Sequence, residues 1–168
     1  MFKIRYASIR KIDITNGPGI RVSLFTQGCN IYCNGCFNSD IWDYGGGKEW
    51  DEESKKLFLD LANKPQIKGI SILGGEPLSP QNFDDLKDLF ITFKELMPNK
   101  SIWLWTGYVF ENLTEEQLEI VKLVDVVIDG PWNIDLGDFN LKYRGSSNQR
   151  IIDVQETLKQ NKVILLNV

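Results

Sequence analysis

The 168-residue sequence contains no histidine, and this absence excludes several kinds of active site. Imidazole is a common general base near neutral pH and a frequent metal ligand, so Ser-His catalysis, Cys-His catalysis and histidine-ligated metals are ruled out. Cysteine is scarce as well: there are three, an odd number that cannot pair completely within one molecule. A secreted fold held together by disulfides is therefore not expected.

An excess of basic side chains is also missing, because 19 lysines and arginines stand against 23 aspartates and glutamates, for a formal net charge of −4. Nucleic-acid-binding proteins normally carry a basic excess, so no nucleic-acid partner is expected. No apolar run approaches the ~20 residues of a membrane span, and residues 1–11 lack the continuous apolar stretch of a signal peptide. The sequence therefore predicts a soluble cytoplasmic protein with no membrane partner.

What is present is an ordinary globular composition, with 42% hydrophobic and 25% charged residues. Apolar, β-branched segments alternate with amphipathic ones, which predicts alternating strands and helices in a single domain covering residues 1–168. We expect strands at 20–26, 67–73, 102–106 and 124–128, a short apolar segment at 151–154 and a last strand-like run at 163–166. We expect helices at 51–62, at 80–97 with Ser79 as N-cap, and at 114–122, where Thr114 and Gln117 have capping-box spacing.

This alternation is typical of a mostly parallel sheet with right-handed crossovers. A complete eight-stranded barrel of ~250 residues does not fit, so the expected fold class is α/β, as a partial (open) β/α barrel. Ligands of such sheets bind at the carboxyl ends of the strands. The unusual residues of the chain all follow predicted strands: Cys29, Cys33 and Cys36; Gly74-Gly75-Glu76-Pro77; Thr106-Gly107; Asp129-Gly130.

The three cysteines have the spacing Cys29-x3-Cys33-x2-Cys36 in a loop rich in asparagine and glycine, which argues against three buried apolar side chains. A closed zinc site would need a fourth ligand that the chain does not offer as Cys or His. An iron–sulfur cluster is the better interpretation. Because such clusters normally take four thiolates, three would leave one iron open for chemistry.

These cysteines, followed by the Gly-Gly-Glu-Pro turn, resemble those of the radical S-adenosylmethionine enzymes. More narrowly, the chain is similar over residues 13–150 to the activating proteins of the anaerobic (class III) ribonucleoside-triphosphate reductase. Six stretches carry this resemblance: Asn16-Gly-Pro-Gly-Ile-Arg21, Cys33-Asn-Gly-Cys-Phe-Asn38, Gly74-Gly-Glu-Pro-Leu-Ser-Pro-Gln-Asn82, Trp103-Leu-Trp-Thr-Gly-Tyr108, Asp129-Gly130 and Arg144-Gly-Ser-Ser-Asn-Gln149.

The resemblance implies a [4Fe-4S] cluster on Cys29, Cys33 and Cys36, and S-adenosyl-L-methionine bound through its amino and carboxylate groups at the open iron. Reductive cleavage would release methionine and a 5′-deoxyadenosyl radical, which takes a hydrogen atom from a glycine of the reductase's glycyl-radical subunit. A low-potential donor such as flavodoxin would supply the electron.

The resemblance also suggests which groups would hold S-adenosylmethionine. Gly35 and Phe37 flank Cys36 and would lie near the adenine, although Gly35 could equally serve to relieve crowding by the cluster. Gly74 and Gly75 would leave their backbone carbonyls and amides open to the ligand.

Glu76 would point over the strand ends as an exposed carboxylate and bind the ligand's ammonium group. Thr106 and Asp129 would hold ribose or a cation beside the carboxylate, unless each caps the next turn. The Asn16–Gly19 turn would cover the site.

The Arg144–Arg150 loop would dock the reductase, unless it is merely solvated. The five tryptophans are expected in the core or at its rim, with Trp132 positioned to face a partner.

Two other function classes stay open. One is activation of another glycyl-radical enzyme, of the pyruvate formate-lyase type, or a radical reaction on a small molecule. The other is a non-enzymatic iron–sulfur or zinc module. Iron and sulfide analysis of anaerobically purified protein distinguishes the module from the enzymes.

Overall fold

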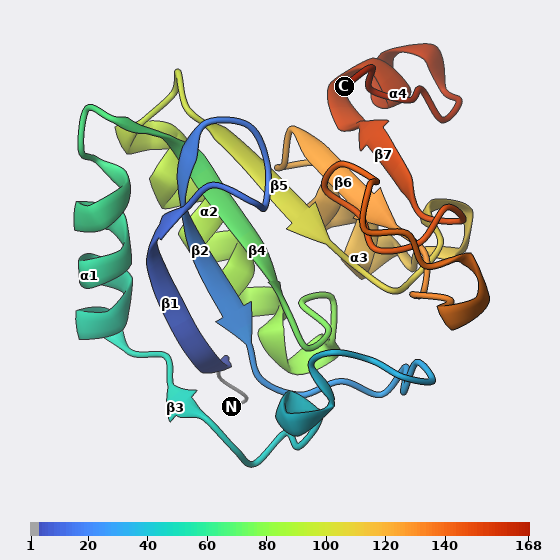
Figure 1. Ribbon diagram of the computed structural model, residues 1–168. Coiled ribbons are helices and arrows are strands. Elements are labelled where there is room, and N and C mark those ends of the chain that lie inside the picture. Colours follow the sequence, from blue (N-terminus) through green and yellow to red (C-terminus); the bar gives the residue numbers. More distant parts are fainter. Residues whose placement is uncertain (1–3) are drawn as a thin grey trace.

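The computed structural model describes residues 4–168 (Figure 1). Residues 1–3, which belong to the expected domain and to the segment expected to lack a signal peptide, lie outside the described residues. Within residues 4–168, seven strands form one sheet in the order β3-β1-β2-β4-β5-β6-β7. Their bounds are β1 (Arg5–Asp13), β2 (Ile20–Thr26), β3 (Lys48–Glu49), β4 (Ile67–Gly74), β5 (Ser101–Trp105), β6 (Val126–Asp129) and β7 (Arg150–Asp153).

The sheet is mixed, so the expectation of a mostly parallel sheet is wrong. β2, β4, β5 and β6 run parallel, whereas β1 is antiparallel to β2 and β3, and β7 is antiparallel to β6. The reason lies in the connections: a parallel pair needs a long crossover, usually a helix. A six-residue turn joins β1 to β2, and the 130–149 loop, which contains no α-helix, joins β6 to β7. The sheet is open, with β3 and β7 at its edges; the partial-barrel shape stays a prediction.

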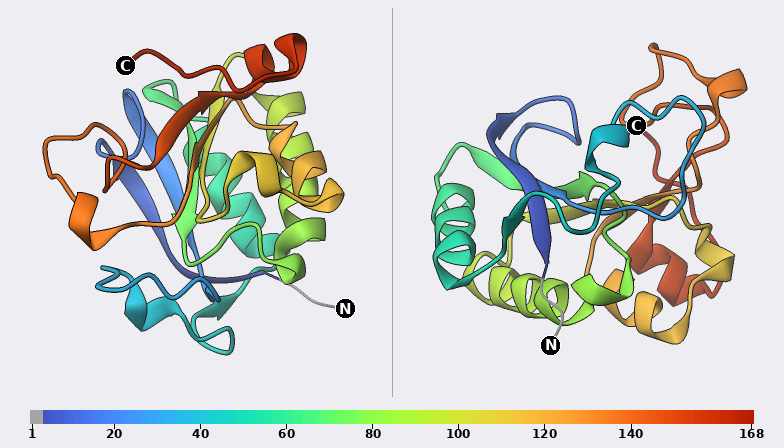
Figure 2. Two further views of the ribbon diagram at one scale, coloured as in Figure 1. Left: turned by 90° about the vertical axis from the view of Figure 1, so that its right-hand side faces the viewer. Right: turned by 90° about the horizontal axis from the view of Figure 1, so that it is seen from below.

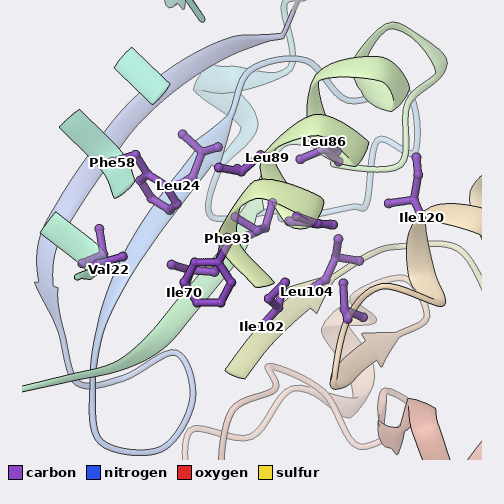
Figure 3. Close-up of a cluster of buried hydrophobic side chains, with 14 of the residues drawn as sticks. Val22, Leu24, Phe58, Ile70, Leu86, Leu89, Phe93, Ile102, Leu104 and Ile120 are labelled. Atoms are coloured by element: carbon purple, nitrogen blue, oxygen red, sulfur yellow. The ribbon is translucent and has the colours of Figure 1, made fainter. Parts of the chain in front are cut away.

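Helices cover one face of this sheet, and loops cover the other (Figure 2). The helices are α1 (Glu52–Ala62), α2 (Phe83–Leu96), α3 (Glu115–Val121) and α4 (Val154–Gln160). Because successive side chains of a strand point to opposite faces, alternate apolar residues of β2, β4 and β5 pack on the helices. Figure 3 shows this core, formed among others by Val22, Leu24, Phe58, Ile70, Leu86, Phe93, Ile102 and Leu104.

The helix starts follow local capping rules with one exception. Asp51 caps α1 by accepting from the Ser54 amide (2.8 Å), and the capping box of Thr114 and Gln117 is confirmed at α3. The expected start of α2 at residue 80 is wrong, since a 3-10 turn occupies Pro80–Asn82 and α2 begins at Phe83. Ser79 makes no side-chain capping bond there, because its hydroxyl lies 2.9 Å from the Tyr44 hydroxyl.

The terminal segments differ most from the expected elements. β1, β3 and α4 were not expected. The expected strand at 163–166 is wrong: the segment forms one isolated antiparallel bridge, between Ile152 and Leu165, which is too short to extend the sheet. Between residues 4 and 168, none of the helices combines the length and apolarity needed to span a bilayer.

Candidate functional site

The cysteines lie in a loop that leaves the carboxyl end of β2 and folds back on itself. The Gly28 amide donates to the Ile41 carbonyl (2.7 Å), and the Cys29 amide donates to the Trp42 carbonyl (3.0 Å). Gly28 has a φ of +98°, and a Cβ there would lie 2.1 Å from the Tyr44 ring. Since only glycine tolerates both constraints, this residue fixes the path by which the chain enters the cysteine loop.

The three thiols form a donor set of the kind that iron–sulfur clusters use. All three cysteines are free and half-buried. Burial raises the pKa of the Cys29 and Cys33 thiols. Neighbouring sulfurs raise these pKa values further: Cys33 raises that of Cys29, and Cys36 raises that of Cys33. The Cys36 sulfur already accepts a hydrogen bond from the Asn38 amide (3.4 Å), a contact that tunes thiolate ligands.

Within residues 4–168, no three His, Cys, Asp or Glu side chains already converge as a metal site. The fit to a cluster therefore rests on the chemistry and common loop of the three thiols.

The Gly74-Gly75 pair is required by the close approach of this loop to the end of β4. Gly74 has a φ of +112°, and a Cβ on Gly75 would lie 2.2 Å from the Gly28 carbonyl oxygen. The Gly75 amide donates to the Thr26 carbonyl (2.8 Å), and the Glu76 amide donates to the Gly28 carbonyl (2.7 Å). The expectation of an open amide is therefore wrong for Gly75. Within the part of the chain that the structure describes, the Gly75 carbonyl accepts no hydrogen bond.

Glu76 is 1% exposed, so the expectation of an exposed carboxylate is wrong. Its Oε2 accepts from the Leu78 amide (2.8 Å) and the Thr106 hydroxyl (2.7 Å), and its Oε1 accepts from the Gly107 amide (2.7 Å). Burial raises the pKa of Glu76 to about 7, although the three hydrogen bonds lower it. The side chain ties the end of β4 to the end of β5.

Thr106 and Asp129 lie at the ends of β5 and β6, where the sequence predicts them, and both are engaged by protein groups. Thr106 Oγ1, besides donating to Glu76, accepts from the Tyr108 amide (3.1 Å). Asp129 is buried, accepts from the Phe110 amide (2.8 Å) and pairs with Arg150, whose Nε lies 3.0 Å from Oδ1. The contact with Tyr108 matches the capping alternative for Thr106, whereas the partners of Asp129 are distant in sequence and do not belong to the turn that follows it.

Arg150 completes a chain of charges, since its guanidinium also binds the exposed carboxylate of Glu111 (2.7 Å). The hydrogen bonds that Arg150 donates to Asp129 and, to a lesser extent, to Glu111 raise the pKa of Arg150, and the same bond lowers the pKa of Glu111.

A cavity of about 370 Å³ lies beside the cysteine loop, on the sheet face opposite the helices. This volume lies within the roughly 300–1,000 Å³ of small-molecule sites. Its walls come from five separate segments: Asn16 from the β1–β2 turn, Cys36 and Phe37 from the cysteine loop, Leu73 from β4, Trp105 from β5, and Tyr143 and Arg144 from the 130–149 loop. The cavity therefore brings together Cys36, Phe37 and the covering turn, three features that the sequence predicts.

Trp105 and Tyr143 were missed as site residues. The Trp105 indole Nε1 donates to the Tyr143 carbonyl (2.7 Å), which fixes both beside the cavity. The sequence predicts Trp105 only in the core or at its rim, because no local spacing relates positions 105 and 143. The outward phase of β5, in which Trp103 and Trp105 alternate with core residues, was the available signal.

A buried polar network holds the covering turn in place. Asp13 accepts from the Ser23 hydroxyl (2.6 Å), the Asn16 side-chain amide (2.7 Å) and the Thr15 amide (2.9 Å). Burial alone would raise the pKa of Asp13, and these hydrogen bonds together lower it to about 2. Asp13 therefore stays ionised and ties the turn to β2.

Arg21 links the same turn to β4 and β5. Its buried guanidinium donates to the Ser71 hydroxyl (2.9 Å), the Ser101 hydroxyl (3.0 Å) and the Pro18 carbonyl (3.3 Å). Burial lowers the pKa of Arg21 to about 10, so the side chain remains charged near neutral pH.

The 144–150 loop is folded against the end of β6 rather than extended into solvent. Gln149 Oε1 accepts from the Gly145 amide (2.9 Å), Gln149 Nε2 donates to the Gly130 carbonyl (3.1 Å), and Asn148 Nδ2 donates to the Pro131 carbonyl (2.7 Å). Side-chain amides thus fix the loop, as the polar composition of its sequence permits.

Gly35 and Phe37 differ in their surroundings. Gly35 has a φ of +73°, and a Cβ there would lie 2.9 Å from the Ile134 side chain, so the close approach of the 130–149 loop favours glycine at this position. The Phe37 ring borders the cavity and lies 5.2 Å, between centroids, from the Trp132 ring.

Comparison with known proteins gives a consistent result. Residues 15–152 match the family described as a 4Fe-4S single cluster domain. The chain is 39% identical over 148 residues to the anaerobic ribonucleoside-triphosphate reductase-activating protein of Escherichia coli (strain K12), covering 87% of this chain and 96% of that protein. It is 41% identical over 148 residues to the protein of that name from Enterobacteria phage T4 (88% and 93% covered). For the protein of that name from Vibrio cholerae, the identity is 36% over 150 residues (88% and 97% covered).

Proposed function

Because this chain belongs to the family of anaerobic ribonucleoside-triphosphate reductase-activating proteins and carries a 4Fe-4S single cluster domain, we propose that it activates such a reductase by generating its glycyl radical. When bound, a reduced [4Fe-4S] cluster supplies one electron to S-adenosylmethionine, so that methionine leaves and the 5′-deoxyadenosyl radical takes a hydrogen atom from a glycine of the reductase. The protein supplies binding, orientation and exclusion of water.

Cys29, Cys33 and Cys36 are the proposed cluster ligands. One observation carries this proposal: three free, half-buried thiols share one loop, and that loop borders a cavity at the carboxyl ends of the parallel strands. Ligands of open α/β sheets bind at this edge. The absence of histidine is compatible with the chemistry, since hydrogen-atom transfer needs no imidazole base.

S-adenosylmethionine is proposed to occupy the cavity of about 370 Å³. The Gly75 carbonyl, two residues beyond Leu73 of the cavity wall, is the proposed acceptor for its ammonium group, and Phe37, which lines the cavity, supplies an aromatic face for the adenine. Glu76 is then a positioning residue. Its hydrogen bonds to Leu78, Thr106 and Gly107 hold the turn after β4, and this turn sets the position of Gly75. Thr106 and Asp129 act in the same indirect way, since the Tyr108 amide donates to the Thr106 hydroxyl and Arg150 donates to Asp129.

The electron is proposed to come from a low-potential donor protein such as flavodoxin. The whole of residues 1–168 is proposed to act as one radical S-adenosylmethionine domain, with its open sheet as a partial barrel.

The test begins with anaerobic reconstitution. We expect about four iron and four sulfide per chain and dithionite-dependent cleavage of S-adenosylmethionine. Incubation with a candidate reductase should then produce a glycyl-radical doublet in electron paramagnetic resonance. Bound zinc without cleavage would instead support a non-enzymatic module, and cleavage with radical formation only on a formate-lyase-type enzyme would support the other class of activator.

A further inference from the structure

A second groove, of about 450 Å³, lies next to the cavity and is apolar over most of its lining. It runs between the cysteine loop and the 130–149 loop, which lie on the same side of the sheet (Figure 2). Three large apolar side chains on it face solvent: Phe139 is 95% exposed, Phe37 72% and Ile134 51%. Contiguous exposed apolar groups of this kind mark interaction sites on soluble proteins.

The groove is held in shape by contacts beneath it. The Phe37 ring lies 5.2 Å from Trp132 and 6.3 Å from Phe139, between centroids, so the aromatic groups form one continuous surface. Gly35 and Gly145 line the groove without side chains. A Cβ at Gly145 would lie 2.8 Å from the Trp132 ring, so the two segments are in close contact there. These contacts pre-organise the groove, and a pre-organised surface lowers the entropy cost of binding a partner.

The groove is also continuous with the proposed cofactor cavity. Phe37, Trp132, Arg144 and Gly145 line both. Any polypeptide that delivers a backbone Cα into the cavity from this side must therefore lie across the groove. A main chain with apolar side chains fits its aromatic walls.

We propose that this groove, formed by Gly35, Phe37, Trp132, Ile134 and Phe139, binds the segment of the reductase chain that carries the target glycine. This inference rests on the proposed function and assigns the docking surface for its substrate. The recognised feature is a large apolar side chain next to the glycine, inserted between Phe139 and Ile134. The 144–150 loop supports the groove through Gly145 and contributes no extended arm of its own.

The experiment separates docking from cofactor chemistry. Phe139→Ser and Ile134→Ser each remove an exposed side chain, and Leu96→Ser removes a leucine at the end of α2, 61% exposed, as a control outside the groove. We expect all three variants to cleave S-adenosylmethionine at the wild-type rate without reductase. We expect the two groove variants to bind the reductase about tenfold more weakly and to form proportionally less glycyl radical at limiting reductase.

The other outcomes are distinct. Wild-type binding and radical yield in both groove variants would overturn the docking surface and leave the proposed function intact. A change in oligomeric state, measured by light scattering, with unchanged reductase binding would assign the groove to a second copy of this chain and overturn the proposal. Failure of the wild-type protein itself to cleave S-adenosylmethionine would contradict the proposed function instead.

Discussion

The two sides of the candidate site are built differently. At the ends of β4, β5 and β6, the polar groups of Glu76, Thr106 and Asp129 are buried and bonded to other protein groups. In the cysteine loop, the three sulfurs are half-buried, and the Cys36 sulfur accepts a hydrogen bond from the Asn38 amide (3.4 Å). On the first side, the polar groups are bonded to other protein groups, so we call it the scaffold side. On the second side, the thiols are available to coordinate a ligand. Side chains of the first side should matter for stability, and those of the second for chemistry.

The largest expected effect lies in the cysteine loop. Cys29→Ala, Cys33→Ala and Cys36→Ala should each abolish cleavage of S-adenosylmethionine, because two thiolates cannot hold a cluster with one defined open iron. The thermal melt of the cluster-free protein should stay close to wild type, since these thiols are only half-buried. Asn34→Ala, an exposed change within the same loop, is the control. Cleavage retained by any cysteine variant would remove that cysteine from the ligand set.

Glu76 tests the scaffold side. Glu76→Gln replaces one acceptor oxygen with a donor that faces the Leu78 or Gly107 amide, so we expect a loss of about 2–3 kcal/mol in the free energy of unfolding. Glu49→Gln, at a side chain 76% exposed, should change it by less than ~0.5 kcal/mol. Urea denaturation of the cluster-free proteins gives both values. Unchanged stability with lost cofactor binding would return Glu76 to the role of a direct ligand.

Asp13 tests the network under the covering turn through pH. Its pKa is about 2 in the folded protein against 3.8 as the ordinary value, so it binds fewer protons folded than unfolded. Its contribution of about 2 kcal/mol is then fully present above pH ~4 and disappears as the pH falls through ~2. Asp13→Asn should lower stability at pH 7 by that amount and flatten this acid dependence. Asp135→Asn, at an exposed carboxylate, should leave both unchanged.

Glu111 should show the smallest effect. Its carboxylate binds Arg150 at the exposed end of the charge chain, where solvent screens the pair. Glu111→Gln should therefore cost less than ~1 kcal/mol and leave cleavage of S-adenosylmethionine unchanged. A loss much larger than this in thermal denaturation would mean that Arg150 depends on Glu111 to hold Asp129.

The sequence predicts the regular elements of the interior well, because local periodicity determines them. Alternating apolar residues in β2, β4 and β5, and the helical spacing in α2, reflect burial on one face. β1 was not expected because its sequence, RYASIRKID, carries charges and is only partly buried near the sheet edge. α4 was missed because its seven residues are too few for a clear helical period.

The identity of the residues at the strand ends was predictable, but the burial and hydrogen bonding of their side chains were not. The cysteine spacing and the glycines at strand ends are local signals. The burial of Glu76 depends on Thr106 and Gly107, thirty residues away, and that of Asp129 depends on Arg150. The adjacency of β4 and β5 was predictable, but these side-chain contacts join residues far apart in sequence, and no local pattern reports them.

The shortness of β3 has a consequence for how copies of this molecule behave in a concentrated solution. β3 pairs only with Arg5 and Tyr6, so within residues 4–168 no strand covers the outer edge of β1 from Ala7 onward. Exposed edges of this kind invite edge-to-edge pairing and aggregation. Here Arg10 and Lys11 place positive charges along the edge, and two irregularities in the β1–β2 register distort it. A flat template for a neighbouring chain is thereby avoided, although the sheet itself is left unclosed.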